Sequence, residues 1–536
     1  MNFVRYITLI ICSASGILGN VDLPQRVLQY RPGDWISYSM FRYVTSAVLG
    51  QEYVYFGTTG GVLRYQFFEN KWEHPFTVSD GLENDYIRDL IYDFNTGFLW
   101  CLTDAGVSFR DPSSEYWRTN TGLSRFGRLK DIGAGRNYIW VTDGKEYIPL
   151  DPLSGYEQSS VAGDMPPDNV RWKDESAEGL DNSYFMDPQY MFVQGGIQDS
   201  EFRTYPITVT IQDQFHSQWL GTWGMGIGMA DKTSLTLKFY QRGLYSPDVE
   251  AMAWDQEGMW MGGLPDDKTP PGITYWNMND DTWHYYEAVN LPGLVSDAVT
   301  AIVVDESRVW FGTLYGLARY DKQTDEWRTF TVQDNLWDDE ITCLTMNDSI
   351  LWAGTPQGIN RIDQGGHIHK VTDEQMMHRQ IYQMDAGEDV WAATDRGIYR
   401  YQYKTDKWLP IEGYAGMIIN EITAVAVYGH EVWFGSEEGI QMVNLETGEW
   451  TGFPAAHYPT SGVKYSILPD VTAVWVGCDQ GVRKYIRQDN RWHLFTTEDG
   501  LPDNNVHWIL LDADHIWFGT PGGLTRFYWN APYRID

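Results

Sequence analysis

The chain has 536 residues, of which 73 are acidic and 39 are basic, so its formal net charge is −34 at pH 7. This charge disfavours nucleic acid, which binds to basic surfaces, and it disfavours anionic lipid surfaces. The length is far more than one compact domain needs.

The first stretch, residues 1–19, reads MNFVRYITLIICSASGILG. Arg5, a short apolar run and small residues together predict a secretory signal peptide. The apolar run is too short to span a bilayer, and no later stretch approaches the roughly 18 apolar residues that a membrane helix needs. We therefore expect an exported protein, periplasmic or extracellular, without a membrane span. Lipoprotein anchoring through Cys12 is the less favoured alternative, because Ile11 is a poor residue before a lipidated cysteine.

One pattern then recurs along the chain, and residues 309–330 show it most clearly as VWFGTLYGLARYDKQTDEWRTF. It combines a strand, a Gly-Thr-x-x-Gly turn, a second strand, an Asp-x-x-Thr turn and a third strand. An anchor tryptophan marks each copy, most of them about 42 residues apart, which is the spacing of four-stranded propeller blades. The anchors are Trp100, Trp140, Trp219, Trp260, Trp310, Trp352, Trp391, Trp433, Trp475 and Trp517, and Tyr55 occupies the same slot.

The repeat predicts an all-β fold, a β-propeller of four-stranded blades, with about 11–12 blades. A second tryptophan closes many copies, as Trp327 does in the copy above. The two slots account for most of the 25 tryptophans, so the aromatic content is mainly architecture. Only the remaining tryptophans can argue for a binding site.

The two ends of the repeat region complement each other. Residues 35–38 (WISY) resemble the last strand of a unit, and residues 516–529 supply the first strands of one. Pairing them would close a ring and remove two exposed sheet edges. Because rings usually hold four to eight blades, we expect two rings in a nested arrangement. A single large ring and a serial division near Leu291 are the alternatives.

The nested arrangement assigns residues 20–150 and 430–536 to an outer ring and residues 190–430 to an inserted ring. Between them, residues 151–189 are rich in Pro, Asp, Ser and Gly and read as an insertion or a degenerate blade. Three cysteines follow the leader, without a Cys-x-x-Cys motif or a histidine pair at zinc spacing. We find no catalytic motif and expect no metal and no cofactor.

The repeat resembles the two-component regulator propeller repeat, in which VWFGT-x-x-G-L-x-RYD is followed by DGLP-x-N-x-V. Residues 498–506 (EDGLPDNNV) match the linking motif closely, and residues 80–84 and 334–336 are partial copies. Proteins with this repeat include sensor portions of hybrid histidine kinases, where the propellers help to sense carbohydrate, and stand-alone exported proteins. A fainter resemblance, of residues 321–327 and 446–450 to the tryptophan docking motif of quinoprotein dehydrogenases, implies architecture only.

The candidate ligand-binding residues lie in loops that share one face of a propeller. Exposed tryptophans beside carboxylates suit sugar stacking combined with hydrogen bonds to hydroxyl groups. The alternative is that these tryptophans pack against neighbouring blades. The candidates are Trp223, Trp337, Asp334, Asp338, Asp80, Asp499 and Asp503.

Three functions remain open from the sequence. The first is an exported, non-enzymatic propeller that binds a ligand, with saccharide as the first expectation, or a partner protein; as a sensor it would need a separate signalling partner. The second is a propeller enzyme acting on glycans through loop-face carboxylates. The third is a scaffold protein of an envelope assembly.

Overall fold

The structure is a computed structural model that describes residues 21–22, 30–113, 115–158, 169–172, 184–266, 269–411 and 421–534. The expected signal peptide and Cys12 lie outside these residues, as do parts of the expected 151–189 insertion. In the described part of the chain, no helix is long and apolar enough to cross a membrane.

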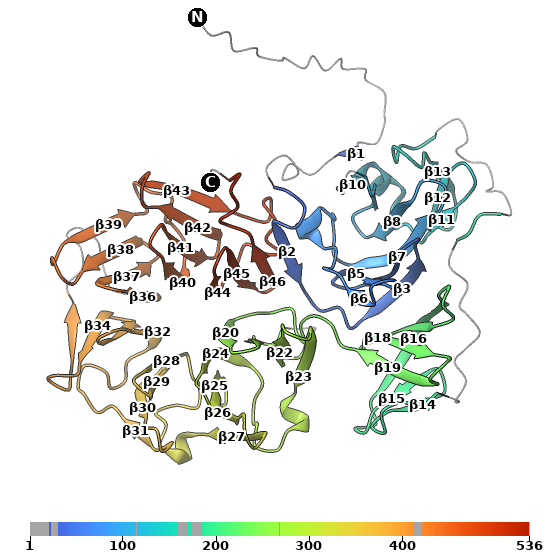
Figure 1. The fold of residues 1–536 in the computed structure, drawn as a ribbon. Helices are drawn as coiled ribbons and strands as arrows, with labels where there is room; N and C mark the ends of the chain where they lie inside the picture. The colour runs from blue at the N-terminus through green and yellow to red at the C-terminus, as the bar shows by residue number, and fades with distance from the viewer. Residues whose placement is uncertain are drawn as a thin grey trace, which may run out of the picture.

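The regular secondary structure of the described chain is almost entirely antiparallel β-sheet, which confirms the all-β propeller prediction (Figure 1). Eleven sheets are present in the described ranges. They divide into two groups, which we call the C-ring and the N-lobe.

The C-ring contains seven sheets whose inner strands contact one another in sequence and close where β44 meets β20. Six of these sheets are continuous in the sequence: β20–β23 (Ala251–Asp255, Gly258–Gly262, Ile273–Asn277, Thr282–Tyr286), β24–β27 (Val299–Val304, Arg308–Thr313, Gly316–Asp321, Glu326–Phe330), β28–β31 (Cys343–Asn347, Ile350–Thr355, Gly358–Ile362, Ile368–Lys370), β32–β35 (Ile381–Ala386, Val390–Thr394, Gly397–Gln402, Lys407–Ile411), β36–β39 (Ala424–Tyr428, Glu431–Ser436, Gly439–Asn444, Trp450–Pro454) and β40–β43 (Lys464–Pro469, Ala473–Cys478, Gly481–Ile486, Arg491–Phe495).

The seventh sheet joins the two ends of the chain. Strands β44 (Trp508–Asp512), β45 (His515–Thr520) and β46 (Gly523–Phe527) are completed by β2 (Trp35–Tyr38), which pairs antiparallel with β46. The rings of Trp35 and Phe527 stack with centroids 3.9 Å apart. The predicted pairing of the WISY segment with the C-terminal unit is therefore confirmed, and Figure 1 shows β2 beside β46.

The N-lobe contains four sheets, whose inner strands contact one another in the order β16, β3, β7, β11. Its strands are β3–β6 (Val44–Leu49, Tyr53–Thr58, Gly61–Gln66, Lys71–Trp72), β7–β10 (Ile87–Asp93, Phe98–Thr103, Val107–Arg110, Trp117–Asn120) joined by β1 (Val21–Asp22), β11–β13 (Asp131–Ala134, Ile139–Thr142, Tyr147–Leu150) and β14–β19 (Met191–Val193, Gly196–Gln198, Thr204–Gln212, Gln218–Thr222, Ile227–Asp231, Thr236–Tyr240).

The grouping of inner strands differs from the ring boundaries expected at residues 150, 190 and 430. The N-lobe lies between β2 and β20, so the ring that includes both chain ends takes β2 and residues 251–527, and residues 44–240 are inserted into it. The reason is that every blade repeats the same local pattern. Blade-to-blade packing decides where a ring closes, and the repeat carries no signal for it.

The repeated turns explain the spacing of Thr and Gly in the pattern. In the blade of β24–β27, Thr313 Oγ1 donates a hydrogen bond to the carbonyl oxygen of Gly316 over 2.7 Å. Gly316 has a φ of +124°, and a Cβ there would lie 2.6 Å from the carbonyl oxygen of Phe330. A side chain is therefore excluded sterically and conformationally at this position. Trp310, the anchor, is 2 % exposed.

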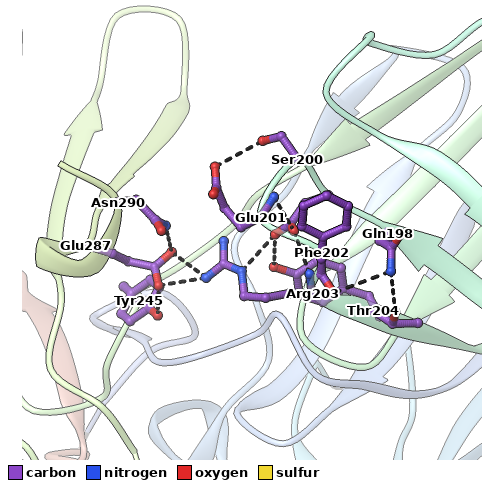
Figure 2. A network of polar contacts seen from close by, with 11 residues as sticks. Gln198, Ser200, Glu201, Phe202, Arg203, Thr204, Tyr245, Glu287 and Asn290 are labelled. Carbon is purple, nitrogen blue, oxygen red and sulfur yellow. Dashed lines mark hydrogen bonds and ion pairs between the residues drawn. The ribbon is translucent and has the colours of Figure 1, made fainter.

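Two linkers connect the N-lobe to the C-ring: residues 39–43, which follow β2, and residues 241–250, the returning linker that precedes β20. They lie antiparallel to each other, with Met40 paired to Gly243. Beside them, a hairpin of the N-lobe reaches the C-ring (Figure 2). Arg203 forms ion pairs of 2.8 Å with Asp199 of its own hairpin and with Glu287 of the C-ring. Tyr245 in the returning linker donates a hydrogen bond of 2.8 Å to the same Glu287. We call this set the lobe clasp.

Candidate functional site

A pocket of about 540 Å³ lies where the inner strands of the C-ring converge. Each of the seven blades contributes a residue from the same position, directly after a buried side chain at the start of its inner strand. These residues are Glu250, Thr300, Thr342, Tyr382, Thr423, Tyr465 and His507. We call this set the mouth positions.

Two of the three mouth-position threonines link neighbouring blades, whereas Thr423 Oγ1 donates to the carbonyl oxygen of Gly435 in its own blade over 3.5 Å. Thr300 Oγ1 donates to the carbonyl oxygen of Ile341 in the next blade over 2.5 Å, and Thr342 donates to that of Ile381 over 2.6 Å. Thr45 makes the same bond to Ile87 in the N-lobe. Since a buried donor and acceptor must be paired, this hydroxyl links neighbouring blades.

Four mouth positions depart from threonine, namely Glu250, Tyr382, Tyr465 and His507. Their side chains are larger and carry charge or an aromatic ring, so they change the chemistry of the pocket. All four belong to the same pocket. A repeat position at which the structural residue is replaced is a candidate functional position.

The pocket is rich in hydrogen-bond acceptors. Tyr382 donates its hydroxyl to Glu421 Oε1 over 2.7 Å. Burial and this carboxylate raise the pKa of Tyr382 to about 12, so the phenol stays protonated. Glu437 and Glu438, in the turn between β37 and β38, also line the pocket, as does the indole of Trp508. Aromatic faces beside carboxylates suit a ligand with many hydroxyl groups.

Glu250 and His507 meet where the blade that begins with β20 contacts the blade that begins with β44. The His507 imidazole forms an ion pair with the Glu250 carboxylate. Burial disfavours the charged imidazole, but the neighbouring Glu250 and Asp248 outweigh it and raise the pKa of His507 above its ordinary value. Burial and the Glu250 charge raise the pKa of Asp248 to about 6, although the amide of Leu264 donates a hydrogen bond to it.

Lys464 also departs from the repeat. Its position is aliphatic in the other six C-ring blades, where the residue before the mouth position is Val or Ile. Lys464 is fully buried, and its Nζ donates to the carbonyl oxygens of Thr460 and, over 2.5 Å, Gly462. Burial lowers the pKa of Lys464 to about 8. Its partner across the ladder is Cys478, in a slot that most blades fill with threonine.

Three of the sequence-predicted acids serve their own loops. Asp80 accepts a hydrogen bond from the amide of Thr77 over 2.9 Å, Asp334 from Thr331 over 3.0 Å and Asp499 from Thr496 over 2.8 Å. Asp80 and Asp334 end short 3-10 turns, Val78–Asp80 and Val332–Asp334, as part of capping boxes. In these two turns Thr77 and Thr331 are the N-cap residues, and the Asp of the motif is the third residue of the turn, whose side chain bonds back to the N-cap amide.

The residue after each capping acid explains the rest of the motif. Gly81, Asn335 and Gly500 have φ values of 111°, 80° and 137°, the left-handed conformation that glycine and asparagine tolerate best. A second acid later in the same loop also bonds to the loop backbone: Asp339 accepts a hydrogen bond from the amide of Val332 over 2.7 Å. The carboxylates of the linking motif therefore accept hydrogen bonds from backbone amides of their own loop.

Asp338 and Asp503 bind the backbone two residues later. Asp338 Oδ1 accepts from the amide of Glu340 over 3.1 Å, and Asp503 Oδ1 accepts from that of Asn505 over 2.8 Å. These bonds are local turn contacts. Asp503 is the nearer of the two to the pocket, because its charge contributes to the raised pKa of His507.

The two predicted tryptophans lie in different lobes. Trp223 is in the N-lobe, 41 % exposed, and its ring meets Tyr43 edge-on with centroids 5.1 Å apart. Trp337 is in the C-ring, where Lys370 Nζ lies 4.7 Å from its ring centroid and its amide donates to Asn360 Oδ1 over 2.9 Å. Trp337 packs against the next blade, and the structure does not bring it together with Trp223.

The mouth positions are the functional candidates that sequence reasoning missed. A signal for them exists, because each follows a buried residue at the start of its inner strand and they recur about every 42 residues. Aligning the blades on that position would have shown Glu250, Tyr382, Tyr465 and His507 replacing threonine. Convergence on one pocket becomes visible only once the ring is closed.

A second hollow, of about 880 Å³, lies at the junction of the lobes. Trp72 and Tyr240 line it from the N-lobe, and Trp283 lines it from the C-ring. Arg242, in the returning linker, forms an ion pair of 2.5 Å with Asp281 at its edge. The rings of Trp72 and Tyr240 meet edge-on with centroids 5.6 Å apart. Because residues of both lobes line this hollow, it is primarily part of the lobe interface.

Comparison with known proteins identifies the repeat. Residues 500–522 match the family described as "Two component regulator propeller". These residues run from the Asp-Gly-Leu-Pro motif through β44 and β45, so the predicted resemblance to this repeat is confirmed. No curated protein matches the chain.

Solved structures share the fold at low sequence identity. PorZ from Porphyromonas gingivalis, described as an essential surface component of the type-IX secretion system, is 13% identical, with a TM-score of 0.56 over 92% of this chain and 87% of that chain. The extracellular domain of the putative hybrid two component system BT3049 from B. thetaiotaomicron is 15% identical, with a TM-score of 0.45 over 91% of this chain and 68% of that chain. That of BT4673 is 16% identical, with a TM-score of 0.45 over 92% and 70%.

Proposed function

We propose that this chain, which carries a two-component regulator propeller repeat, is an exported, non-enzymatic binding module whose ligand occupies the C-ring pocket. The observation that carries the proposal is the convergence of four non-threonine mouth positions on that pocket. Each of these positions carries a charged or aromatic side chain where other blades have threonine, and all four side chains line one pocket.

Saccharide is the ligand class that best fits the lining. Tyr382, Tyr465 and Trp508 offer aromatic faces, and Glu421, Glu437 and Glu438 offer acceptors for hydroxyl groups. A pocket of about 540 Å³ has the size of an ordinary small-ligand site. The acidic lining disfavours anionic sugars, so we expect a neutral or amino-substituted glycan.

A glycan-array screen on the purified mature protein tests this proposal, followed by calorimetry on any glycan that binds. We expect Tyr382→Ala and Glu437→Gln to weaken binding at least about tenfold, since each removes a contact worth on the order of 1–2 kcal/mol. Trp223→Ala is the control, because it removes an exposed tryptophan of the other lobe.

Three results would count against the proposal. Binding that is lost in Trp223→Ala and retained in both pocket variants would move the site to the N-lobe loop face. Release of a shorter glycan during incubation would instead support the enzyme alternative, with the pocket carboxylates as its acids. A protein without any glycan ligand would remove saccharide from consideration.

A role in an envelope assembly is the second candidate. It is favoured by the match to PorZ, which extends over most of both chains. Cross-linking of intact cells followed by mass spectrometry tests it: an assembly component should give reproducible cross-links from one surface to the same partner. Recovery of the protein only as an unlinked monomer would argue against this role.

A further inference from the structure

A mixed cluster of carboxylates and a histidine lies at the closing seam of the C-ring. Asp248, Glu250 and His507 each offer one ligand atom, and these atoms all lie within 4.8 Å of one another. Asp248 and Glu250 precede β20, whereas His507 precedes β44, so the cluster joins segments more than 250 residues apart. Among the described residues, this is the group of at least three His, Cys, Asp or Glu side chains that lie close enough together to hold a metal ion.

Backbone bonds hold the two sides of the cluster in register. The amide of Val249 donates to the carbonyl oxygen of Thr520 in the last blade over 3.0 Å. The amides of Glu250 and His507 donate to Gly262 and Gly519 of their own blades, over 3.0 and 2.9 Å. The three side chains therefore project from a fixed frame, as a preorganised site requires.

Two of the three ligand groups are also oriented by a neighbour. The amide of Leu264 donates to Asp248 Oδ2 over 2.6 Å, which fixes that carboxylate and leaves its other oxygen available. The ring of Tyr465 meets the His507 imidazole edge-on, with centroids 5.0 Å apart. His507 Nδ1 is buried and faces the Glu250 carboxylate without the geometry of a hydrogen bond. Such supporting contacts are typical of metal-binding side chains.

We propose that Asp248, Glu250 and His507 bind one divalent cation of the Zn²⁺ or Mn²⁺ class at the seam of the C-ring. One imidazole nitrogen with two carboxylates suits these cations better than Ca²⁺, which prefers oxygen ligands alone. Three protein ligands leave at least one coordination position for water. Glu250 and His507 also line the pocket, so that position opens toward it.

The proposal is independent of the saccharide assignment. A cation here would connect the first and last blades of the continuous segment and would neutralise charge in a strongly acidic protein. Its first measurable effect is therefore on stability, because a ligand that binds only the folded state raises the unfolding temperature.

Calorimetric titration of tag-free protein with ZnCl₂ and with MnCl₂, after dialysis against a chelator, tests the proposal at physiological salt. We expect one equivalent to bind and the thermal midpoint to rise. Asp248→Asn, Glu250→Gln and His507→Gln should each weaken binding at least about tenfold and abolish the thermal shift. Co²⁺ substitution adds an absorption band that reports on the coordination shell.

A matched control comes from a second place where histidines meet an acid. Asp363 lies 3.1 Å from His367 Nδ1 and 3.5 Å from His369 Nε2, on an exposed hairpin. His367→Gln removes a histidine there and should leave the stoichiometric site unchanged. The proposal is overturned if His367→Gln removes the bound equivalent, if Ca²⁺ displaces it at equal concentration, or if the wild-type protein binds no cation stoichiometrically.

Discussion

At the scale of single residues, the linking loops show acidic side chains used as caps. The carboxylate of Asp334 accepts a hydrogen bond from the amide of Thr331 at the start of a short turn. Its neighbour Asp338 accepts from Glu340 over 3.1 Å within the same loop but caps no turn. The two positions therefore differ in what their removal should cost.

We predict that Asp334→Ala destabilises the protein by about 1 kcal/mol, because it removes the capping-box hydrogen bond between its carboxylate and the Thr331 amide. Asp338→Ala should change stability by less than about 0.5 kcal/mol. Urea denaturation of both variants beside the wild type measures the difference. Equal midpoints for the two variants would show that the capping bond contributes nothing.

Lys464 gives a prediction with a definite pH window. Its pKa is about 8 in the folded protein, against an ordinary value of 10.5. Between these values the unfolded chain binds more protons than the folded chain, so stability rises with pH across this window. The rise amounts to about 3 kcal/mol, and it is absent below pH 8, where both states carry the charge.

The variant Lys464→Met isolates this effect, because a methionine does not titrate. The stability difference between wild type and Lys464→Met should shift in favour of the wild type by about 3 kcal/mol from pH 8 to pH 10.5. Lys238→Met, at an exposed lysine, should show no such trend. Parallel pH profiles for wild type and Lys464→Met would contradict the lowered pKa.

Residue-level prediction from sequence succeeded for architecture and was incomplete for the site. The anchor tryptophans are visible because each must be buried at the same place in every blade, and Trp310 and Trp352 are 2% and 1% exposed. The role of Asp334 was not visible, because a capping carboxylate and a ligand-binding carboxylate share the same loop chemistry. The pocket residues were missed because their common position appears only when the ring is closed.

At the scale of elements, one short strand completes the C-ring. Strand β2 contributes Trp35, which is 2 % exposed and lies among Phe495, Phe518 and Phe527 of the last two blades. The packing joins a segment near the start of the chain to one near its end. Its pairing could be predicted, because an incomplete unit at each end leaves complementary unpaired edges.

We predict that Trp35→Ala destabilises the C-ring by about 3–5 kcal/mol, because the large cavity left among three phenylalanine rings cannot collapse fully. Trp223→Ala, at a half-exposed tryptophan, should cost less than about 1 kcal/mol. Denaturant unfolding followed by limited proteolysis distinguishes them: new cleavage sites in Trp35→Ala should fall in β44–β46. Cleavage confined to the N-lobe would contradict this role of β2.

At the scale of the whole molecule, the lobe clasp links two bodies that the chain joins twice. Arg203 and Glu287 lie 2.8 Å apart with side-chain exposures of 42 % and 18 %. This exposure limits the ion pair to a modest contribution, because solvent screens it. The clasp therefore restrains the hairpin of the N-lobe against the C-ring and adds little to global stability.

A double-mutant cycle with Arg203→Ala and Glu287→Gln should give a coupling energy of about 1 kcal/mol, decreasing at high salt. Hydrogen exchange should rise in residues 199–205 and 287–290 of both single variants. Lys71→Ala, which removes an exposed ion pair of 2.6 Å with Glu69, provides the comparison. Unchanged exchange at the junction would mean that the two linkers alone hold the lobes.

The pairing of β2 with β46 also sets an order in time. Residues 35–38 are synthesised long before their partner strand, which ends at Phe527. The strands of the N-lobe and six blades of the C-ring can form before β46 is made, so closure of the C-ring must follow the synthesis of β46. Such distant contacts form slowly, because a long loop must be closed before the contact stabilises it. A chain that has not reached Phe527 thus carries an open blade edge, which can pair with another chain.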